Sequence, residues 1–280
     1  MNKLPILITV PHGGDKIPIE LNSRTYLKQK DIFEDGDALT REIYNLKNES
    51  AAYIDTSIAR AFIDLNRAPS DRPPSNSDGV VKTVTTMNIP VYKAGDFPDN
   101  NLIQRLLRKY YNPFHLQVDE LQNTHKIKLA LDCHSMLAKS PPISRNPGQE
   151  RPLICLSNRG DKNGNQVQKN KTITCPPGWM RFLKKCFCQA FQFNEDDVKI
   201  NDPFQGGFII QSHYNGTVPW IQLEINRKLY LSPKYFDTIK LTVLPQRLDY
   251  LRDNILKALC LFFNNNLSSI AGGIKLANAK

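Results

Sequence analysis

The chain has 280 residues, of which 40% are hydrophobic and 23% charged. It is therefore long enough to bury one large core, and its composition excludes an intrinsically disordered chain. Lysine and arginine outnumber aspartate and glutamate by 37 to 27, a net charge of +10, but the basic residues are scattered rather than gathered into an arm. The charge therefore favours an anionic small-molecule substrate, and nucleic acid is the less favoured partner.

No apolar run reaches the roughly 18 to 20 residues that a membrane-spanning helix requires, so we expect no membrane partner. The first apolar run leads into Pro11 and His12 rather than a small-residue cleavage site, which favours a buried strand over a secretion signal. The six cysteines show no repeated Cys-x-x-Cys spacing. These features predict a cytoplasmic protein with reduced thiols and without a structural zinc knuckle.

Short runs rich in Ile, Val and Leu, typical of buried strands, alternate with segments whose apolar residues recur at helical spacing. In chain order the predicted elements are strand Leu4–Val10, helix Asp37–Leu46, strand Ala52–Asp55, helix Leu102–Leu121 with a kink at Pro113, strands Ile127–Leu131 and Leu153–Leu156, helix Met180–Phe191, strand Val218–Glu224, and helical residues Ser232–Phe263 interrupted near Pro245. This alternation predicts an α/β fold, a three-layer α/β/α sandwich with a mainly parallel or mixed sheet. We expect one domain over residues 1–280.

Polar residues follow or end three of the predicted strands. The run ILITV leads to His12, KIKLAL leads to His134, and VPWIQL leads to Glu224. Ligands of open α/β sheets bind at the carboxyl ends of strands, so these side chains are expected to lie at one edge of the sheet. Zinc in hydrolases typically takes two histidines and one carboxylate and leaves a position for water. The pattern therefore predicts a catalytic metal site.

The third ligand is expected shortly after His12, where Glu34, Asp35 and Asp37 are the candidate carboxylates. Asp37 also fits a structural role, because it stands at the start of a predicted helix where an acidic residue caps the first turn. The pattern of residues alone leaves this choice open.

Other enzyme classes fit the sequence less well. No Gly-x-Ser-x-Gly elbow accompanies Ser135, which argues against a serine hydrolase. A cysteine amidase built on Cys133 or Cys155 fares no better. The glycines after the first strand fit neither the Walker motif nor the dinucleotide fingerprint. A non-catalytic basic binding module of the same fold stays an alternative, and it would bind nucleic acid in a salt-dependent way without needing metal.

Six short blocks occur in an order that spans roughly residues 5–231. They are PHGG at 11–14, DGD at 35–37, DLNR at 64–67, DCHS at 132–135, GGFIIQSHYNG at 206–216 and QLEINRKLYL at 222–231. Taken together they resemble the N-formylglutamate amidohydrolase family, also called N-formylglutamate deformylases. The resemblance implies a zinc-carboxypeptidase-like fold, one bound Zn²⁺, and hydrolysis of the amide of an N-formyl or N-acyl amino acid.

The resemblance also implies roles for individual residues. His12, Asp37 and His134 are the implied metal ligands, with Asp35 in reserve for Asp37, and Glu224 is the implied general base. The implied substrate-binding residues are Arg67, as a clamp for a carboxylate, Asn66, Arg227, Gly206 and Gly207, while His213 is implied in oxyanion stabilisation or proton transfer. Asp64 and Asp132 are expected to orient the histidines, because metal-bound histidines usually donate their other N–H to a carboxylate.

Some of these assignments have alternatives. As a residue at the end of a predicted strand, Arg227 is expected to point its side chain to the face opposite Glu224, which weakens its assignment to substrate binding. Gly206 and Gly207 fit a turn with positive φ as well as a close approach to substrate. The loop Ser144–Arg151 and residues 158–174 differ from the familiar family pattern, and such loops would shape the pocket. The substrate therefore need not be N-formylglutamate, and a carboxypeptidase-like peptidase or another amidase for anionic substrates stays possible.

Overall fold

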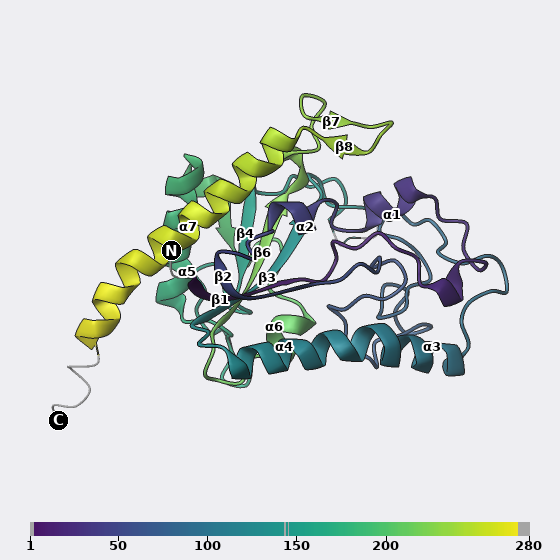
Figure 1. Ribbon diagram of the computed structural model, residues 1–280, viewed down its shortest axis with the longest axis horizontal. Helices are drawn as coiled ribbons and strands as arrows, with labels where there is room; N and C mark the ends of the chain where they lie inside the picture. The colour runs from purple at the N-terminus through teal and green to yellow at the C-terminus, as the bar shows by residue number, and fades with distance from the viewer. Residues whose placement is uncertain (1–2, 143, 145, 274–280) are drawn as a thin grey trace.

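The computed structural model describes residues 3–142, 144 and 146–273. Its centre is a six-stranded sheet in the order β2-β1-β3-β6-β4-β5 (Figure 1). The strands are β1 (Leu4–Val10), β2 (Ser50–Asp55), β3 (Leu129–Met136), β4 (Ile154–Ser157), β5 (Val198–Ile200) and β6 (Trp220–Asn226). The four strands β2, β1, β3 and β6 run parallel, whereas β4 is antiparallel to β6 and parallel to β5. The predicted mixed, mainly parallel sheet is confirmed.

Helices cover both faces of this sheet, as the α/β/α prediction requires (Figure 1). One face carries α2 (Thr40–Ile43), α5 (Pro177–Phe191) and α7 (Pro245–Gly273). The other face carries α1 (Gln29–Asp35), α3 (Asn100–Leu106), the π-helical turn η2 (Leu107–Tyr111), α4 (Asn112–Thr124) and α6 (Phe208–Ser212). The remaining elements are η1 (Ile19–Leu21), η3 (Glu195–Asp197), η4 (Arg227–Leu229), and the hairpin of β7 (Phe236–Asp237) and β8 (Thr242–Val243).

The two faces have separate hydrophobic cores because side chains alternate along each strand. In β1, Ile6 and Ile8 pack against the layer of α5 and α7, whereas Leu7 packs against the layer of α3 and α4. All three side chains are almost completely buried. A strand that is buried on both faces reads as a continuous apolar run, which is why these short strands could be recognised in the sequence.

Three predicted helices differ from the structure in their boundaries. The helix predicted from Asp37 begins only at Thr40, because Leu39 adopts a left-handed conformation with a φ of 59°. Residues 232–244 form no helix, and α7 begins at Pro245, a residue well suited to the first helical turn. At Pro113 the helix continues as α4. The π-helical turn η2 precedes it, because proline has no N–H to donate to the carbonyl four residues back. Among the described residues, no helix combines the length and apolarity needed to cross a membrane.

Candidate metal centre and active site

The pairing of β3 with β6 places His134 next to Glu224. These two residues are partners in the parallel register, so their side chains leave the same face of the sheet near the carboxyl ends of both strands. His12 follows the last residue of the neighbouring strand β1. The prediction that the strand ends bring these three residues together agrees with their shared lining of one cavity.

Asp37 lies in the short segment between α1 and α2, and hydrogen bonds from distant residues fix this segment. Its N–H donates to the carbonyl of His12 over 2.9 Å. The Arg227 guanidinium donates to the carbonyl oxygens of Glu34 at 2.9 Å and Gly36 at 2.5 Å, and it lies 3.3 Å from Asp37 Oδ1. The position of Asp37 therefore depends on the end of β6, far away in the sequence.

His12, Asp37 and His134 form a buried group in which one ligand atom from each lies within 4.8 Å of the others. Oδ2 of Asp37 is 2.9 Å from Nδ1 of His134 and 3.5 Å from Nδ1 of His12. Asp35, the reserve candidate, contacts Lys82 at 3.4 Å and the N–H of Thr86 at 2.7 Å instead. The geometry favours Asp37 as the third member of the group.

Carboxylates contact the Nε2 atoms of His12 and His134, the ring nitrogens that face away from Asp37. Nε2 of His12 lies 2.7 Å from Asp64 Oδ1, and Nε2 of His134 lies 2.9 Å from Asp132 Oδ2. Thr9 in turn donates to Asp132 over 2.9 Å. If Nε2 of each ring carries the proton, Nδ1 of each ring has a free lone pair. These two nitrogens and the carboxylate oxygen of Asp37 then lie close together. Three electron-pair donors at this spacing fit a divalent cation, and the outer carboxylates make the rings better ligands.

The pKa values of these residues show that ionised carboxylates and a protonated imidazole stabilise one another in the site. Burial alone would raise the pKa of Asp37, but His12 and His134 hold it well below its usual range. Burial alone would lower the pKa of His134, but Asp132 and Asp37 raise it well above its ordinary value. Asp64 follows the same pattern, because His12 and Arg60 lower its pKa against the effect of burial. A buried site with these properties needs a proton or a metal ion for its charge balance.

Glu224 differs from the other carboxylates of the site. It is buried, and burial raises its pKa to about 7, with Asp37 also acting to raise it. Gln222 donates from Nε2 to Glu224 Oε1 over 2.9 Å and accepts a hydrogen bond from the N–H of Gly207. Gln222 was not predicted as a site residue, although its spacing of two from Glu224 puts both side chains on one face of β6.

A cavity of about 400 Å³ opens beside the metal-ligand group. Its wall includes four arginines: Arg60, Arg67, Arg151 and Arg227. Arg67, predicted as a carboxylate clamp, is partly exposed there and pairs through Nη2 with Asp78 Oδ2 at 2.5 Å. Asn66, its predicted companion, lies with Nδ2 3.2 Å from His134 Nε2 and accepts a hydrogen bond from the N–H of Ile209.

Gly206 and Gly207 also line the cavity. Gly206 has a φ of +108°, which a residue with a side chain rarely adopts, so the turn interpretation holds at this position. A Cβ on Gly207 would lie only 2.3 Å from Asn66 Nδ2. A side chain at 207 would therefore displace the Asn66 side chain from its present position.

Arg227 requires a correction. The expectation that it points away from Glu224 was wrong, because β6 ends at Asn226 and Arg227 begins the turn η4, so strand alternation no longer applies. Its side chain is buried against the same cavity as Glu224. Because its donors already bind Ser135 Oγ and the segment that carries Asp37, it positions a metal-ligand candidate.

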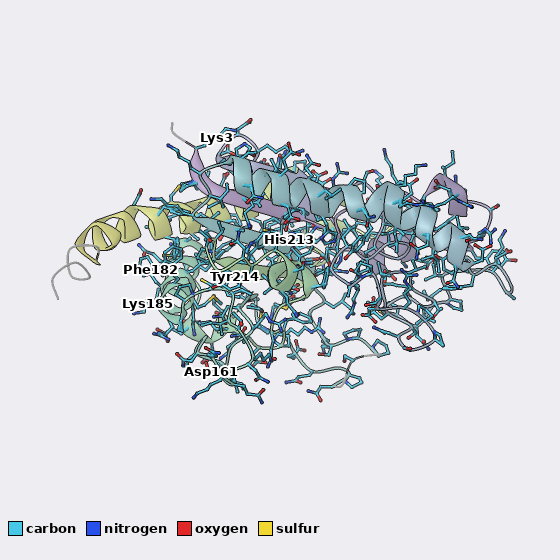
Figure 2. All side chains as sticks on the ribbon, turned by 90° about the horizontal axis from the view of Figure 1, so that it is seen from below. Lys3, Asp161, Phe182, Lys185, His213 and Tyr214 are labelled. Carbon is cyan, nitrogen blue, oxygen red and sulfur yellow. The ribbon has the colours of Figure 1, made fainter. Side chains whose placement is uncertain are left out.

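His213 lies outside the residues that line the cavity. It follows α6 (labelled in Figure 2) and contacts two residues of α4, with Nδ1 2.6 Å from Asp119 Oδ1 and Nε2 2.8 Å from His115 Nδ1. The structure does not bring it together with the other candidate residues. The prediction of a catalytic role for His213 gains no support from this placement.

A network of buried charges beside the cavity was also absent from the sequence-based predictions. Lys82 is fully buried and pairs with Asp78 at 2.7 Å and with Asp35 at 3.4 Å. Arg60 pairs with Asp64 at 3.0 Å. Two of its ion pairs join residues four apart in the sequence, but the contact of Lys82 with Asp35 forms only in the folded chain.

Comparison with known proteins gives one family and one fold. The family model described as N-formylglutamate amidohydrolase matches residues 4–231. No curated relative matches the chain at a significant level. The N-formylglutamate amidohydrolase from Ralstonia eutropha JMP134 has a similar structure, with a TM-score of 0.71 and 18% identity over 94% of this chain and 95% of that one.

Two further structures resemble the chain to different degrees. A gene product of Agrobacterium tumefaciens has a TM-score of 0.63 and 16% identity over 96% of this chain and 92% of that one. A metallo-carboxypeptidase from Burkholderia cenocepacia has a TM-score of 0.37 and 10% identity, and covers 94% of this chain and 58% of that one. The last likeness is too distant to bear on the chemistry. The match of the family model over residues 4–231, most of the chain, shows that the chain belongs to the N-formylglutamate amidohydrolase family.

Proposed function

We propose that the protein is a Zn²⁺-dependent amidohydrolase that removes a formyl or other acyl group from the nitrogen of a small anionic amino acid. Membership of the N-formylglutamate amidohydrolase family supports a hydrolase of this type. The observation that carries the proposal is the buried convergence of His12, Asp37 and His134 beside a cavity that Glu224 also lines.

His12, Asp37 and His134 would hold one Zn²⁺ through two imidazole nitrogens and a carboxylate oxygen, a donor set that zinc hydrolases commonly use. When bound, the ion supplies Lewis-acid polarisation of the acyl oxygen and makes a water molecule more acidic. Asp64 and Asp132 keep the protons on the outer ring nitrogens, so the inner nitrogens stay available to the cation.

Glu224 is the general base of the proposed reaction. It takes a proton from the attacking water and gives a proton to the amine nitrogen as the bond between that nitrogen and the acyl carbon breaks. The products are the carboxylic acid of the acyl group and the free amino acid. A pKa raised by burial to about 7 suits both steps, because the group can then accept and release a proton near neutral pH.

Arg67 binds the α-carboxylate of the amino acid in this proposal. Its guanidinium uses Nη2 for Asp78 and lines the cavity while still partly exposed, which leaves other N–H donors for a ligand. Asn66 and the backbone at Gly206 and Gly207 shape the wall beside it.

The six cysteines are free, and this favours a reducing compartment. We therefore propose that the enzyme works in the cytoplasm.

The test is the substitution Glu224→Gln, which keeps the shape of the side chain and removes its basicity. Zinc-loaded wild type should hydrolyse at least one member of a panel of N-formyl and N-acetyl amino acids. The variant should keep its zinc within about twofold while kcat falls by about 10²- to 10⁴-fold, the usual contribution of a general base. Bound zinc is measured by elemental analysis and turnover by release of the free amine.

Glu120→Gln is the matched control, because Glu120 is an exposed carboxylate on α4 and should leave kcat unchanged. Retained turnover in Glu224→Gln would refute the base assignment. A wild-type enzyme that hydrolyses the panel equally well after complete removal of zinc would refute the metal-dependent mechanism.

A further inference from the structure

Arg151 differs from the other three arginines of the cavity in having no anionic partner. Arg60 pairs with Asp64, Arg67 pairs with Asp78, and Arg227 is bound by the segment that carries Asp37. Among the described residues, no carboxylate lies within ion-pair distance of the Arg151 guanidinium, and its buried Nε has no hydrogen-bond partner. Among the four arginines of the cavity, Arg151 is therefore the one whose guanidinium has no anionic partner within the described residues.

The surroundings of Arg151 hold this guanidinium in place. Its Cζ lies 4.9 Å from the centre of the Phe204 ring, which also lines the cavity. Its backbone N–H donates to Ala138 over 2.9 Å, and its carbonyl accepts a hydrogen bond from Asn226 Nδ2 at the end of β6. A guanidinium that lies over an aromatic ring keeps the edges that carry its N–H groups available for a planar acceptor.

The electrostatics of the site also favour an anion at this position. Burial lowers the pKa of Arg151, and Arg227 acts more weakly in the same direction, while Glu224 and Cys155 act to raise it. A buried N–H without an acceptor is unfavourable, and a charged acceptor would remove that penalty. Two parallel hydrogen bonds to a carboxylate match the geometry of an arginine.

We propose that Arg151 is a specificity-determining residue that binds the side-chain carboxylate of the substrate, while Arg67 binds the α-carboxylate. Arg151 is then the residue of this chain that selects an acidic side chain of the substrate over a neutral one. This inference rests on the proposed function for the identity of the substrate, but the binding of a dicarboxylate by Arg151 can be measured without turnover.

The experiment compares two ligands of nearly the same shape by calorimetry on the zinc-loaded protein. Glutarate has two carboxylates, whereas in glutaramate an amide replaces one of them. Wild type should bind glutarate at least about tenfold more tightly than glutaramate. Arg151→Gln should weaken glutarate binding by about 10- to 100-fold and change glutaramate binding by less than about twofold. Arg151→Lys, which keeps the charge without the planar fork, should lose part of the preference.

Arg181→Gln is the control for the loss of one positive charge, because Arg181 is exposed on α5 and does not line the cavity. It should bind both ligands as wild type does. The inference is overturned if wild type shows no preference for glutarate, if Arg151→Gln keeps the preference, or if that variant loses both ligands equally.

A kinetic comparison adds a second readout. Arg151→Gln should raise KM for N-formyl-L-glutamate far more than for N-formyl-L-glutamine, with little change in kcat for the latter, because the residue contacts the side chain and not the reacting atoms. If wild type hydrolyses neither substrate but keeps its preference for glutarate, the proposed function fails while the role of Arg151 in binding stands.

Discussion

Carboxylates outside the metal-ligand group determine how well the imidazoles of the site could bind a cation. Asp64 accepts hydrogen bonds from His12 Nε2 at 2.7 Å, from Arg60 at 3.0 Å and from the N–H of Asn66 at 2.9 Å. It thereby fixes the ring orientation and the tautomer of His12. A negative charge at this place also makes the inner nitrogen a better electron-pair donor.

We therefore predict that Asp64→Asn weakens Zn²⁺ binding by about 10- to 100-fold, because the hydrogen bond stays possible but the charge is lost. The dissociation constant is measured by competition with a chelator. Asp119→Asn is a matched control, since Asp119 makes the same kind of contact to His213, which lies outside the metal-ligand group. Equal zinc affinity in the Asp64 variant and wild type would disprove this role.

At the residue scale, the sequence identifies the candidates that stand at strand ends and leaves open those that loops position. His12, His134 and Glu224 follow recognisable apolar runs, so their convergence could be expected from the topology of parallel strands. Asp37 could not be separated from Asp35 by spacing. The choice depends on Arg227 and on the hydrogen bond of Asp37 to His12, which form only in the folded chain.

Two histidines link helices α4 and α6 at the level of secondary structure elements. Nδ1 of His115 on α4 lies 2.8 Å from Nε2 of His213, and Nε2 of His115 lies 3.1 Å from the carbonyl oxygen of Leu65. Burial lowers the pKa of His115 to about 4, and the nearby His213 acts in the same direction. The unfolded chain, with a histidine pKa of about 6.5, therefore binds more protons than the folded chain between these two values.

The stability that His115 contributes is consequently present above pH 6.5 and is lost as the pH falls toward 4. Between pH 7 and pH 5 this loss amounts to about 2 kcal/mol in the free energy of unfolding. Over the same pH interval, the free energy of unfolding of His115→Gln should fall less than that of wild type, and the difference should be about that amount. Denaturant titrations at both pH values measure it, and His125→Gln, an exposed change at the end of α4, should behave as wild type. An unchanged pH dependence in the His115 variant would contradict this explanation.

The prediction of elements from the sequence succeeds where apolar patterns are continuous. The strands β1 to β4 and β6 and the helix α5 overlap their predicted ranges. The helix α1 was not predicted, because the segment Gln29–Asp35 is mostly polar. Only Ile32 and Asp35 are buried in it. The short strand β5 was also missed, since three residues carry too little pattern to distinguish a strand from a loop.

At the scale of the whole molecule, the sheet brings together residues from the first fifth, the middle and the last quarter of the chain. The parallel order β1-β3-β6 places their carboxyl ends at one edge, and the α1–α2 segment closes over that edge with Asp37. The site gathers four carboxylates around two imidazoles in a chain whose net charge is +10, and these are Asp37, Asp64, Asp132 and Glu224. Arg60 and Arg227 offset part of this negative charge, and a cation between the imidazoles would offset more of it.

The central claim is that His12, Asp37 and His134 bind one metal ion. The most direct test is an anomalous-difference map at the zinc absorption edge from crystals grown with Zn²⁺. We predict one strong peak about 2.0 to 2.2 Å from Nδ1 of both histidines and from a carboxylate oxygen of Asp37. No peak between these three residues, or a peak at another group of side chains only, would contradict the claim.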